Sequence, residues 1–373
     1  MKNKMIQFLL EYANPSIKRR IKDEILHNLT PEEADQYQEQ ILQEPNIKRC
    51  LASQLDNGWF GYGFHGTNKN AGQFENQETC TKYLGEKAVH KYTPALMRSM
   101  DAFIKIPLDD GCYRTKGKYY DEFILAANGQ NLIRCACIAR AGYADEIDIS
   151  PQVKLSIDSF KRVLEVDSVM DISRTIRNGK QRVFIDHEKW PCRYHLDILA
   201  HTESWKNEEN RKIVADSIIK MMKTDRPELF NLVPASWVGY ALGTLGGFPS
   251  QGLSIKCNGV YPFPVINEPG KPAYYNLEYI EWFARCGIVP YVPALQEAIK
   301  DIVNSIDGDG ICRLSVPDDM FKGWGPYAGL QLEVDWKSKI RRYCDVTFRA
   351  LLILHYSNQR SFTYTGWTCN HKI

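Results

Sequence analysis

The chain has 373 residues, with 47 lysines and arginines against 45 aspartates and glutamates, so its formal net charge is only +2. This balance argues against a nucleic-acid-binding protein, and no apolar run approaches the roughly 20 residues that a membrane-spanning helix needs. Hydrophobic residues make up 44% and charged residues 25% of the chain, which is typical of a soluble protein with a large core.

The cysteines and the first residues indicate the compartment. The 11 cysteines are an odd number, and most lie inside helix-like runs, which favours reduced thiols over a disulfide framework. Residues 1–13 have too short an apolar core for a signal peptide and no small-residue cleavage site. We therefore expect a cytoplasmic protein.

Residues 1–44 predict an N-terminal helical extension that packs on the rest of the chain. A short helix is expected at 6–12 and a second after Pro15, and Thr30 with Glu33 forms a capping box for a third. We expect one helical domain over residues 45–357 and a C-terminal tail over 358–373.

A repeated helical hairpin is the strongest pattern in this domain. Residues 80–114 and 276–314 each predict a helix, a break before a proline, a second helix and a closing Asp-Gly turn, and looser copies span 131–164 and 189–222. The matching residues of the two best copies are Tyr92, Pro94, Ala95 and Leu96 with Tyr291, Pro293, Ala294 and Leu295.

Three segments interrupt the helical pattern. Residues 246–275 and 316–336 are rich in glycine, proline and aromatic residues, which is typical of lids or binding elements. The charged segment 171–188 contains one candidate strand, at 182–185.

The turn from Gln54 to Gly61, with the sequence QLDNGWFG, resembles the repeat turn of the α/α toroid found in squalene cyclases, related terpene cyclases and protein prenyltransferase β subunits. Asp110-Gly111 and Asp309-Gly310 are degenerate copies. The resemblance extends from Pro45 onward at the level of the repeat plan. It implies an all-α fold, an incomplete (α/α)6 barrel of about six hairpins, with an apolar polyprenyl-type substrate in an aromatic-lined central cavity.

The acid and metal motifs of these families do not appear in the sequence. There is neither the Asp-x-Asp-Asp motif of squalene cyclases nor the Asp-Asp-x-x-Asp motif of class I terpene synthases, and the prenyltransferase zinc ligands cannot be assigned. We therefore expect no metal and no cofactor. A zinc set is a conceivable alternative, formed by Cys135, Cys137, Cys192 and His195.

The helix that follows Trp190 contains the most concentrated candidate site. At 100° per residue Tyr194, Asp197, His201 and Trp205 share one face. An Asp–His pair at i, i+4 can form an acid–base couple, and flanking aromatic rings can stabilise a cation. We expect Asp197, His201 and Tyr194 to be catalytic; the alternative is a surface Asp–His pair.

Further residues are candidates for binding the substrate. His65 lies between Phe64 and Gly66 in a glycine-rich loop that can present it to a cleft, although backbone groups could equally satisfy it. The tryptophan of the repeat turn could bind substrate or simply pack over a helix end. The candidates are His65, Trp59, Trp205, Trp237 and Trp324.

Two functions follow from these patterns. The first is a terpenoid-cyclase-like enzyme that begins cyclisation or prenyl chemistry by acid–base catalysis. The second is a non-catalytic toroid scaffold or small-molecule-binding module, which the missing acid motifs favour. The first requires Asp197 and His201 to face an open central cavity.

Overall fold

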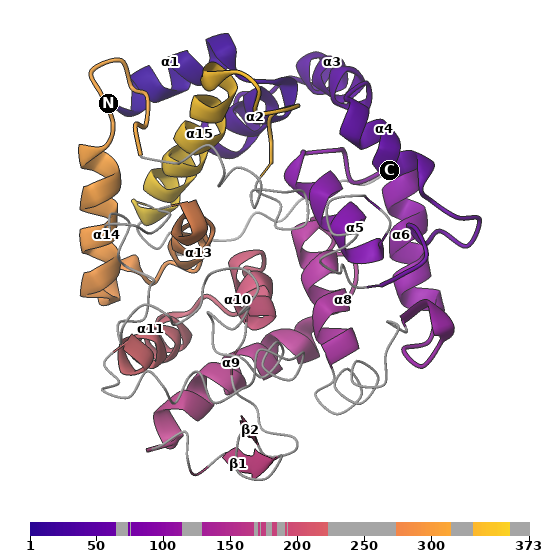
Figure 1. Ribbon diagram of the computed structural model, residues 1–373, viewed down its shortest axis with the longest axis vertical. Coiled ribbons are helices and arrows are strands. Elements are labelled where there is room, and N and C mark those ends of the chain that lie inside the picture. The colour runs from indigo at the N-terminus through magenta and orange to yellow at the C-terminus, as the bar shows by residue number, and fades with distance from the viewer. Residues whose placement is uncertain are drawn as a thin grey trace, which may run out of the picture.

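The computed structural model describes residues 1–64, 74, 76–113, 129–167, 171, 173–176, 181–184, 191, 193–222, 274–314 and 331–358. These residues are mostly helical, which confirms the predicted all-α class (Figure 1). None of their helices is long and apolar enough to cross a membrane. His65, Trp237 and Trp324 lie outside the described residues, as do residues 246–273 and 359–373 of the predicted loop and tail.

The N-terminal region consists of short helices with clear start signals. They are α1 (Lys2–Tyr12), α2 (Pro15–Arg20) with a π-helical turn (Ile21–Ile25), α3 (Pro31–Leu42) and α4 (Pro45–Ala52). Asn14 caps α2 by accepting a hydrogen bond from the Ile17 backbone N–H at 3.1 Å. The predicted capping box of Thr30 and Glu33 is present at the start of α3.

Each predicted hairpin is present as two helices. The pairs are α5 (Gln77–Glu86) with α6 (Pro94–Lys105), α8 (Gly129–Arg140) with α9 (Ser150–Glu165), α10 (Arg193–Ala200) with α11 (Glu208–Met222), and α13 (Tyr274–Arg285) with α14 (Pro293–Asn304), followed by α15 (Lys339–Ser357). Prolines open α6, α9 and α14 in their first turn, where the missing N–H has no intrahelical partner.

The first helices of these pairs form the inside of the molecule. Contacts run from α5 to α8, then to α10, α13 and α15, while α6, α9, α11 and α14 lie towards the outside (Figure 1). The outer helices are amphipathic: α14 buries Leu295, Ala298 and Ile302 and exposes its charged residues. Nearly all of α5 is buried, although it contains Glu78, Lys82 and Glu86.

Two glycines allow close approaches between helices. Gly58 has a φ of +87°, and a Cβ there would lie 2.4 Å from the Arg98 carbonyl oxygen. Gln54 Nε2 donates to the Gly58 and Ala95 carbonyl oxygens at 2.9 and 2.7 Å, so the repeat turn ties α4 to α6. A Cβ at Gly85 would lie 2.6 Å from the Arg140 carbonyl oxygen, and this close packing of α5 against α8 brings their charged residues together.

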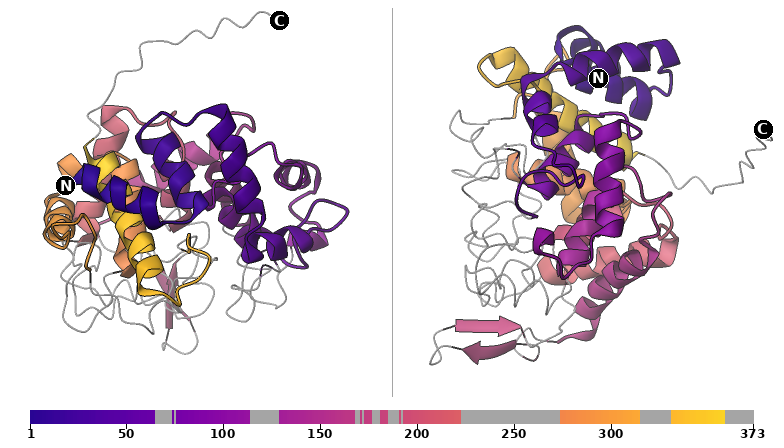
Figure 2. Two further views of the ribbon diagram at one scale, coloured as in Figure 1. Left: turned by 90° about the horizontal axis from the view of Figure 1, so that it is seen from above. Right: turned by 90° about the vertical axis from the view of Figure 1, so that its right-hand side faces the viewer.

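One small β-hairpin is present among the described residues. β1 (Ser173–Ile176) pairs antiparallel with β2 (Gln181–Phe184), with Ser173 opposite Phe184. The hairpin lies at one end of the molecule, beyond α9 (Figure 2). The sequence indicated β2, displaced by one residue, but not its partner β1.

Candidate functional site

The predicted polar face of α10 points into the protein. The Asp197 side chain is fully buried and that of His201 is 12% exposed. The alternative of a surface Asp–His pair is therefore wrong. α10 ends at Ala200, so His201 and Trp205 lie in the turn that follows it, where the Trp205 Nε1–H donates to the Leu199 carbonyl oxygen at 2.9 Å.

Asp197 and His201 are in contact, as the spacing predicts. His201 Nδ1 lies 3.1 Å from Asp197 Oδ1 and 2.8 Å from the Asp197 backbone oxygen. The imidazole meets the Trp282 ring edge to face, with 6.3 Å between ring centroids. These contacts fix the orientation of the His201 ring.

Two cations from other helices approach the Asp197 carboxylate. Lys82 Nζ on α5 lies 3.1 Å from Oδ2, and Arg140 Nε on α8 lies 3.4 Å from Oδ1. Burial by itself would raise the pKa of Asp197, but the charges of Arg140 and Lys82 and the His201 hydrogen bond outweigh it and hold the pKa well below its usual range. A carboxylate held in its charged form by two cations is unsuited to donating a proton at neutral pH.

Tyr194 is also held inside the protein. Its hydroxyl donates to Glu78 Oε1 at 2.8 Å, and Lys82 Nζ lies 4.5 Å from the centre of its ring. Lys82 in turn contacts Glu78 at 3.1 Å. Tyr194, Asp197 and Lys82 thus belong to one buried polar cluster at the junction of α5, α8 and α10.

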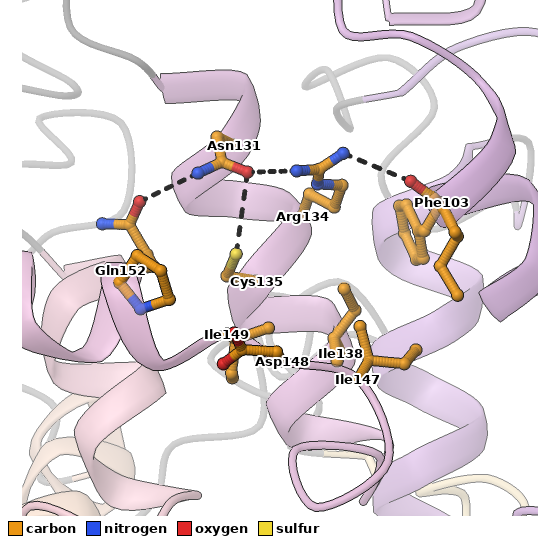
Figure 3. Close-up of a pocket in the computed structure, with 11 residues that line it drawn as sticks. Phe103, Asn131, Arg134, Cys135, Ile138, Ile147, Asp148, Ile149 and Gln152 are labelled. Carbon is orange, nitrogen blue, oxygen red and sulfur yellow. Dashed lines mark hydrogen bonds between the residues drawn. The ribbon is translucent and has the colours of Figure 1, made fainter.

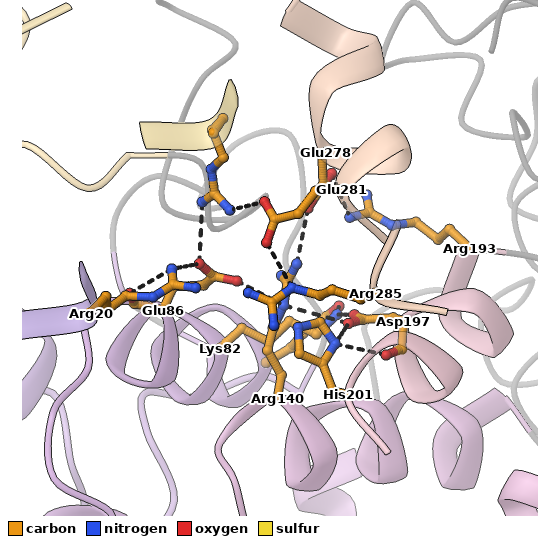
Figure 4. Close-up of polar contacts among 12 residues, drawn as sticks. Arg20, Lys82, Glu86, Arg140, Arg193, Asp197, His201, Glu278, Glu281 and Arg285 are labelled. Carbon is orange, nitrogen blue, oxygen red and sulfur yellow. Dashed lines mark hydrogen bonds and ion pairs between the residues drawn. The ribbon is translucent and has the colours of Figure 1, made fainter. Parts of the chain in front are cut away.

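This cluster is one end of a larger set of buried ion pairs, which we call the central network (Figure 4). Arg140 reaches Glu278 of α13 at 3.1 Å and Glu86 of α5 at 3.5 Å. Glu86 also accepts from Arg20 at 2.8 Å and from Arg349 of α15 at 3.2 Å. A single glutamate therefore joins α2, α5, α8 and α15.

The network continues from Arg349 to the N-terminal region. Arg349 contacts Glu281 at 2.6 Å, Arg285 contacts Glu281 at 2.8 Å, and Arg285 reaches Glu24 at 3.2 Å. The members are balanced in charge: they are the cations Arg20, Lys82, Arg140, Arg193, Arg285 and Arg349 and the carboxylates Glu24, Glu78, Glu86, Asp197, Glu278 and Glu281.

Pairing keeps the carboxylates of the network charged. Burial would raise the pKa of Glu24, but Arg20 and Arg285 lower it to about 2, and Arg349, Arg20 and Arg140 likewise hold the pKa of Glu86 below its usual range. Moving a charge out of water costs several kcal/mol, so such a network is tolerated only when every member has close partners.

A second buried group has a different composition, and we call it the acidic cluster. It contains the carboxyl groups of Glu44, Glu333 and Asp345 around one cation, Lys87, which contacts Glu44 at 2.5 Å. Glu333 accepts from the Asn14 backbone N–H at 2.9 Å, and Asp345 accepts from the Glu333 N–H at 3.1 Å. Burial, followed by the charge of Asp345, raises the pKa of Glu333 to about 8, and burial raises that of Asp345 to about 6.

Trp59 and Trp205, the other predicted binding residues among those described, lie in the hydrophobic core. Trp59 is 1% exposed and packs against Phe64, Phe103 and Tyr113, so it offers no surface to a substrate. Trp205 is 3% exposed. The structure therefore supports packing, and not substrate binding, as the role of Trp59.

No metal site is found in the described part of the chain. Cys135 and Cys137 are buried, and burial raises the pKa of both thiols. Cys192 lies outside the described residues. Within those residues, no group of three or more His, Cys, Asp or Glu side chains is arranged to hold a metal ion.

Sequence reasoning found the Asp197–His201 pair but missed the partners that neutralise Asp197. A signal was present: Glu78, Lys82 and Glu86 recur at four-residue spacing on α5, in the first helix of a hairpin, where burial is greatest. α13, which is also the first helix of a hairpin, contains Glu278 and Glu281.

Comparison of the chain with protein-family models, curated proteins and solved structures finds no match. The resemblance of the Gln54–Gly61 turn to the terpenoid cyclases and prenyltransferases therefore stays a prediction.

Proposed function

We propose that this protein is an α/α toroid that acts as a non-catalytic scaffold or small-molecule-binding module, in which the central network holds the inner helices together. The observation that carries this proposal is the fully buried Asp197 carboxylate between Lys82 and Arg140. A cyclase of the squalene type begins with proton donation from an acid, and a carboxylate held in its charged form by two cations opposes that step.

The toroid itself is part of the proposal. It is supported by the contacts of α5, α8, α10, α13 and α15 in chain order and by the outer positions of their partner helices. In this arrangement α1 and α14 both contact α15, and α4 with its repeat turn begins the ring.

The charges of the inner helices also disfavour a polyprenyl ligand at the centre. Such a ligand gains its binding energy by removing apolar surface from water into an apolar site. The described inner residues instead present guanidinium and carboxylate groups, which lose more on contact with a hydrocarbon than they gain.

Incubation with polyprenyl alcohols and polyprenyl diphosphates, with and without Mg²⁺, followed by product analysis, tests the proposal. We expect no product from the native protein, and a lower midpoint of thermal unfolding for Asp197→Asn. A cyclised or prenylated product that disappears in Asp197→Asn would overturn the proposal.

One observation favours a second candidate, an enzyme in which His201 acts as a base. The 3.1 Å contact between His201 Nδ1 and Asp197 Oδ1 is the arrangement in which a carboxylate orients an imidazole for proton transfer at Nε2. Its test is the same product analysis on His201→Gln. Turnover by the native protein that is lost in a folded His201→Gln supports this candidate, and unchanged turnover excludes it.

A further inference from the structure

A cavity of about 310 Å³ lies between the end of α6, α8 and the start of α9 (Figure 3), and its lining contains no residue of the central network. We call it the Arg134 pocket, after the basic residue in its wall. Its volume is at the lower end of the range of about 300–1,000 Å³ for small-molecule sites. Its lining includes Asn131, Arg134, Ile138, Ile147, Asp148, Ile149 and Gln152.

One wall of the Arg134 pocket is a chain of oriented polar groups. Arg134 Nη1 donates to the Phe103 carbonyl oxygen at 3.2 Å, and Nη2 donates to Asn131 Oδ1 at 2.5 Å. Asn131 Nδ2 donates to Gln152 Oε1 at 3.2 Å. These bonds hold the guanidinium in place before any ligand arrives, which lowers the entropy cost of binding.

Arg134 differs from the arginines of the central network in the partners of its charge. Each of those contacts at least one carboxylate, whereas Arg134 makes no ion pair among the described residues. A guanidinium has five N–H donors in a planar fork that matches a carboxylate. The first turns of α8 and α9, which also line the pocket, add the positive ends of two helix dipoles.

The part of the wall below these polar groups is apolar. Ile138, Ile147 and Ile149 line it below Asn131 and Arg134 (Figure 3). Ile147 is partly exposed, whereas Ile138 and Ile149 are buried and support the wall from behind. A ligand with an anionic head and a hydrocarbon tail would satisfy both walls.

Asp148 limits the charge of that ligand. It lies on the side of the pocket away from Arg134, beside Ile149 (Figure 3). Its carboxylate accepts from the Ser150 backbone N–H at 2.9 Å, and hydrogen bonds from Ser150 lower its pKa, so it stays ionised. A second negative charge at the tail end of a ligand would be repelled.

We propose that the Arg134 pocket binds a small monocarboxylate with a short apolar tail. The carboxylate accepts hydrogen bonds from the Arg134 guanidinium, and the tail packs over Ile147, with Ile138 and Ile149 behind it. The inference rests on the small-molecule-binding part of the proposed function and gives that function a site and a ligand class.

Isothermal titration calorimetry of the full chain with hexanoate tests the site. We expect saturable binding of one hexanoate per chain, with weaker binding of hexan-1-ol, which lacks the charge, of hexylamine, which reverses it, and of adipate, which adds a second carboxylate. Arg134→Met should weaken hexanoate binding by at least about tenfold, as expected for the loss of a charge-assisted hydrogen bond. Arg134→Lys should retain part of the affinity.

Two further variants complete the test. Arg98→Met is the matched control, because Arg98 also bonds to a side-chain amide, that of Gln54, but does not line the pocket; it should bind hexanoate like the native protein. Ile147→Trp fills the cavity and leaves Arg134 in place, so it should abolish binding even if Arg134→Met fails to fold. Absence of saturable hexanoate binding, or equal binding by native protein and Ile147→Trp, would overturn the inference.

The two proposals fail in different ways. Hexanoate binding together with turnover of polyprenyl diphosphates would refute the non-catalytic function alone. Absence of both would refute the Arg134 pocket alone.

Discussion

The central network and the acidic cluster both bury several carboxyl groups, yet they differ in the number of cations beside them. In the central network every carboxylate contacts a lysine or an arginine, and the pKa values of Glu24, Glu86 and Asp197 are lowered. In the acidic cluster three carboxyl groups surround Lys87, and the pKa of Glu333 rises to about 8. Burial alone therefore does not decide whether a carboxyl group is charged; its partners do.

Removing a cation from the central network should have the largest effect on stability, because it breaks the balance of charge. Arg140→Met leaves Asp197, Glu86 and Glu278 with one cation fewer in a buried site. Loss of one partner of a buried pair costs about 3–5 kcal/mol, and we expect at least that loss in the free energy of unfolding, measured by urea denaturation at pH 7.

Arg162→Met is the matched control, since Arg162 pairs with Glu165 at the surface of α9 at 3.7 Å. Its effect should stay within about 0.5 kcal/mol. If Arg140→Met were as mild as Arg162→Met, the central network would not be holding the inner helices together.

The acidic cluster should make stability fall as the pH rises. The pKa of Glu333 in the folded protein, about 8, lies above its ordinary value of 4.5, so the folded state binds more protons between those values. Stability contributed by the protonated group is complete below the unfolded pKa and is lost as the pH rises through the folded pKa. The loss should be on the order of a few kcal/mol.

Glu333→Gln should flatten this dependence in urea denaturation between about pH 5 and pH 9. The glutamine oxygen can still accept from the Asn14 backbone N–H. Asp335→Asn is the control: that carboxylate accepts from Lys337 N–H and Arg341, and its pKa is lowered. A native protein whose stability is constant from pH 5 to pH 9 would contradict the raised pKa.

The stability that the central network contributes should instead fall as the pH is lowered. The pKa of Glu24 is about 2 in the folded protein, so its stabilisation is present above its ordinary pKa and is lost as the pH falls towards 2. Glu24→Gln should lower stability at pH 7 by about 2 kcal/mol or less and make the loss in acid shallower. Glu203→Gln, at an exposed carboxylate beside Lys206, should leave the acid limb unchanged; equal acid limbs in all three proteins would contradict the assignment.

Much of the fold could be predicted because its signals are local. Thr30 and Glu33 specify a capping box, and prolines at the starts of α6 and α14 mark the repeat. Gly58 and Gln54 form the turn that the sequence places at residues 54–61. Each of these signals lies within a few residues of the structure it specifies.

The site could be predicted only in part, because its charges are balanced by tertiary contacts. The spacing of Asp197 and His201 fixes their contact within one turn. The protonation of Asp197 is decided by Lys82 of α5 and Arg140 of α8. No local sequence pattern predicts that these two helices meet beside Asp197. The same limit applies to Trp59, whose burial depends on Phe103 and Tyr113.

The most direct test is an NMR titration of the side-chain carboxyl carbons in protein labelled with ¹³C at aspartate and glutamate, with Asp197→Asn and Glu333→Gln used to assign the two resonances. We expect the Asp197 resonance to keep the shift of an ionised carboxylate from pH 8 down to the onset of acid unfolding, while the Glu333 resonance titrates near pH 8. An Asp197 carboxyl group that takes up a proton above about pH 5 would contradict the structural role of the central network and return Asp197 to the position of a candidate acid.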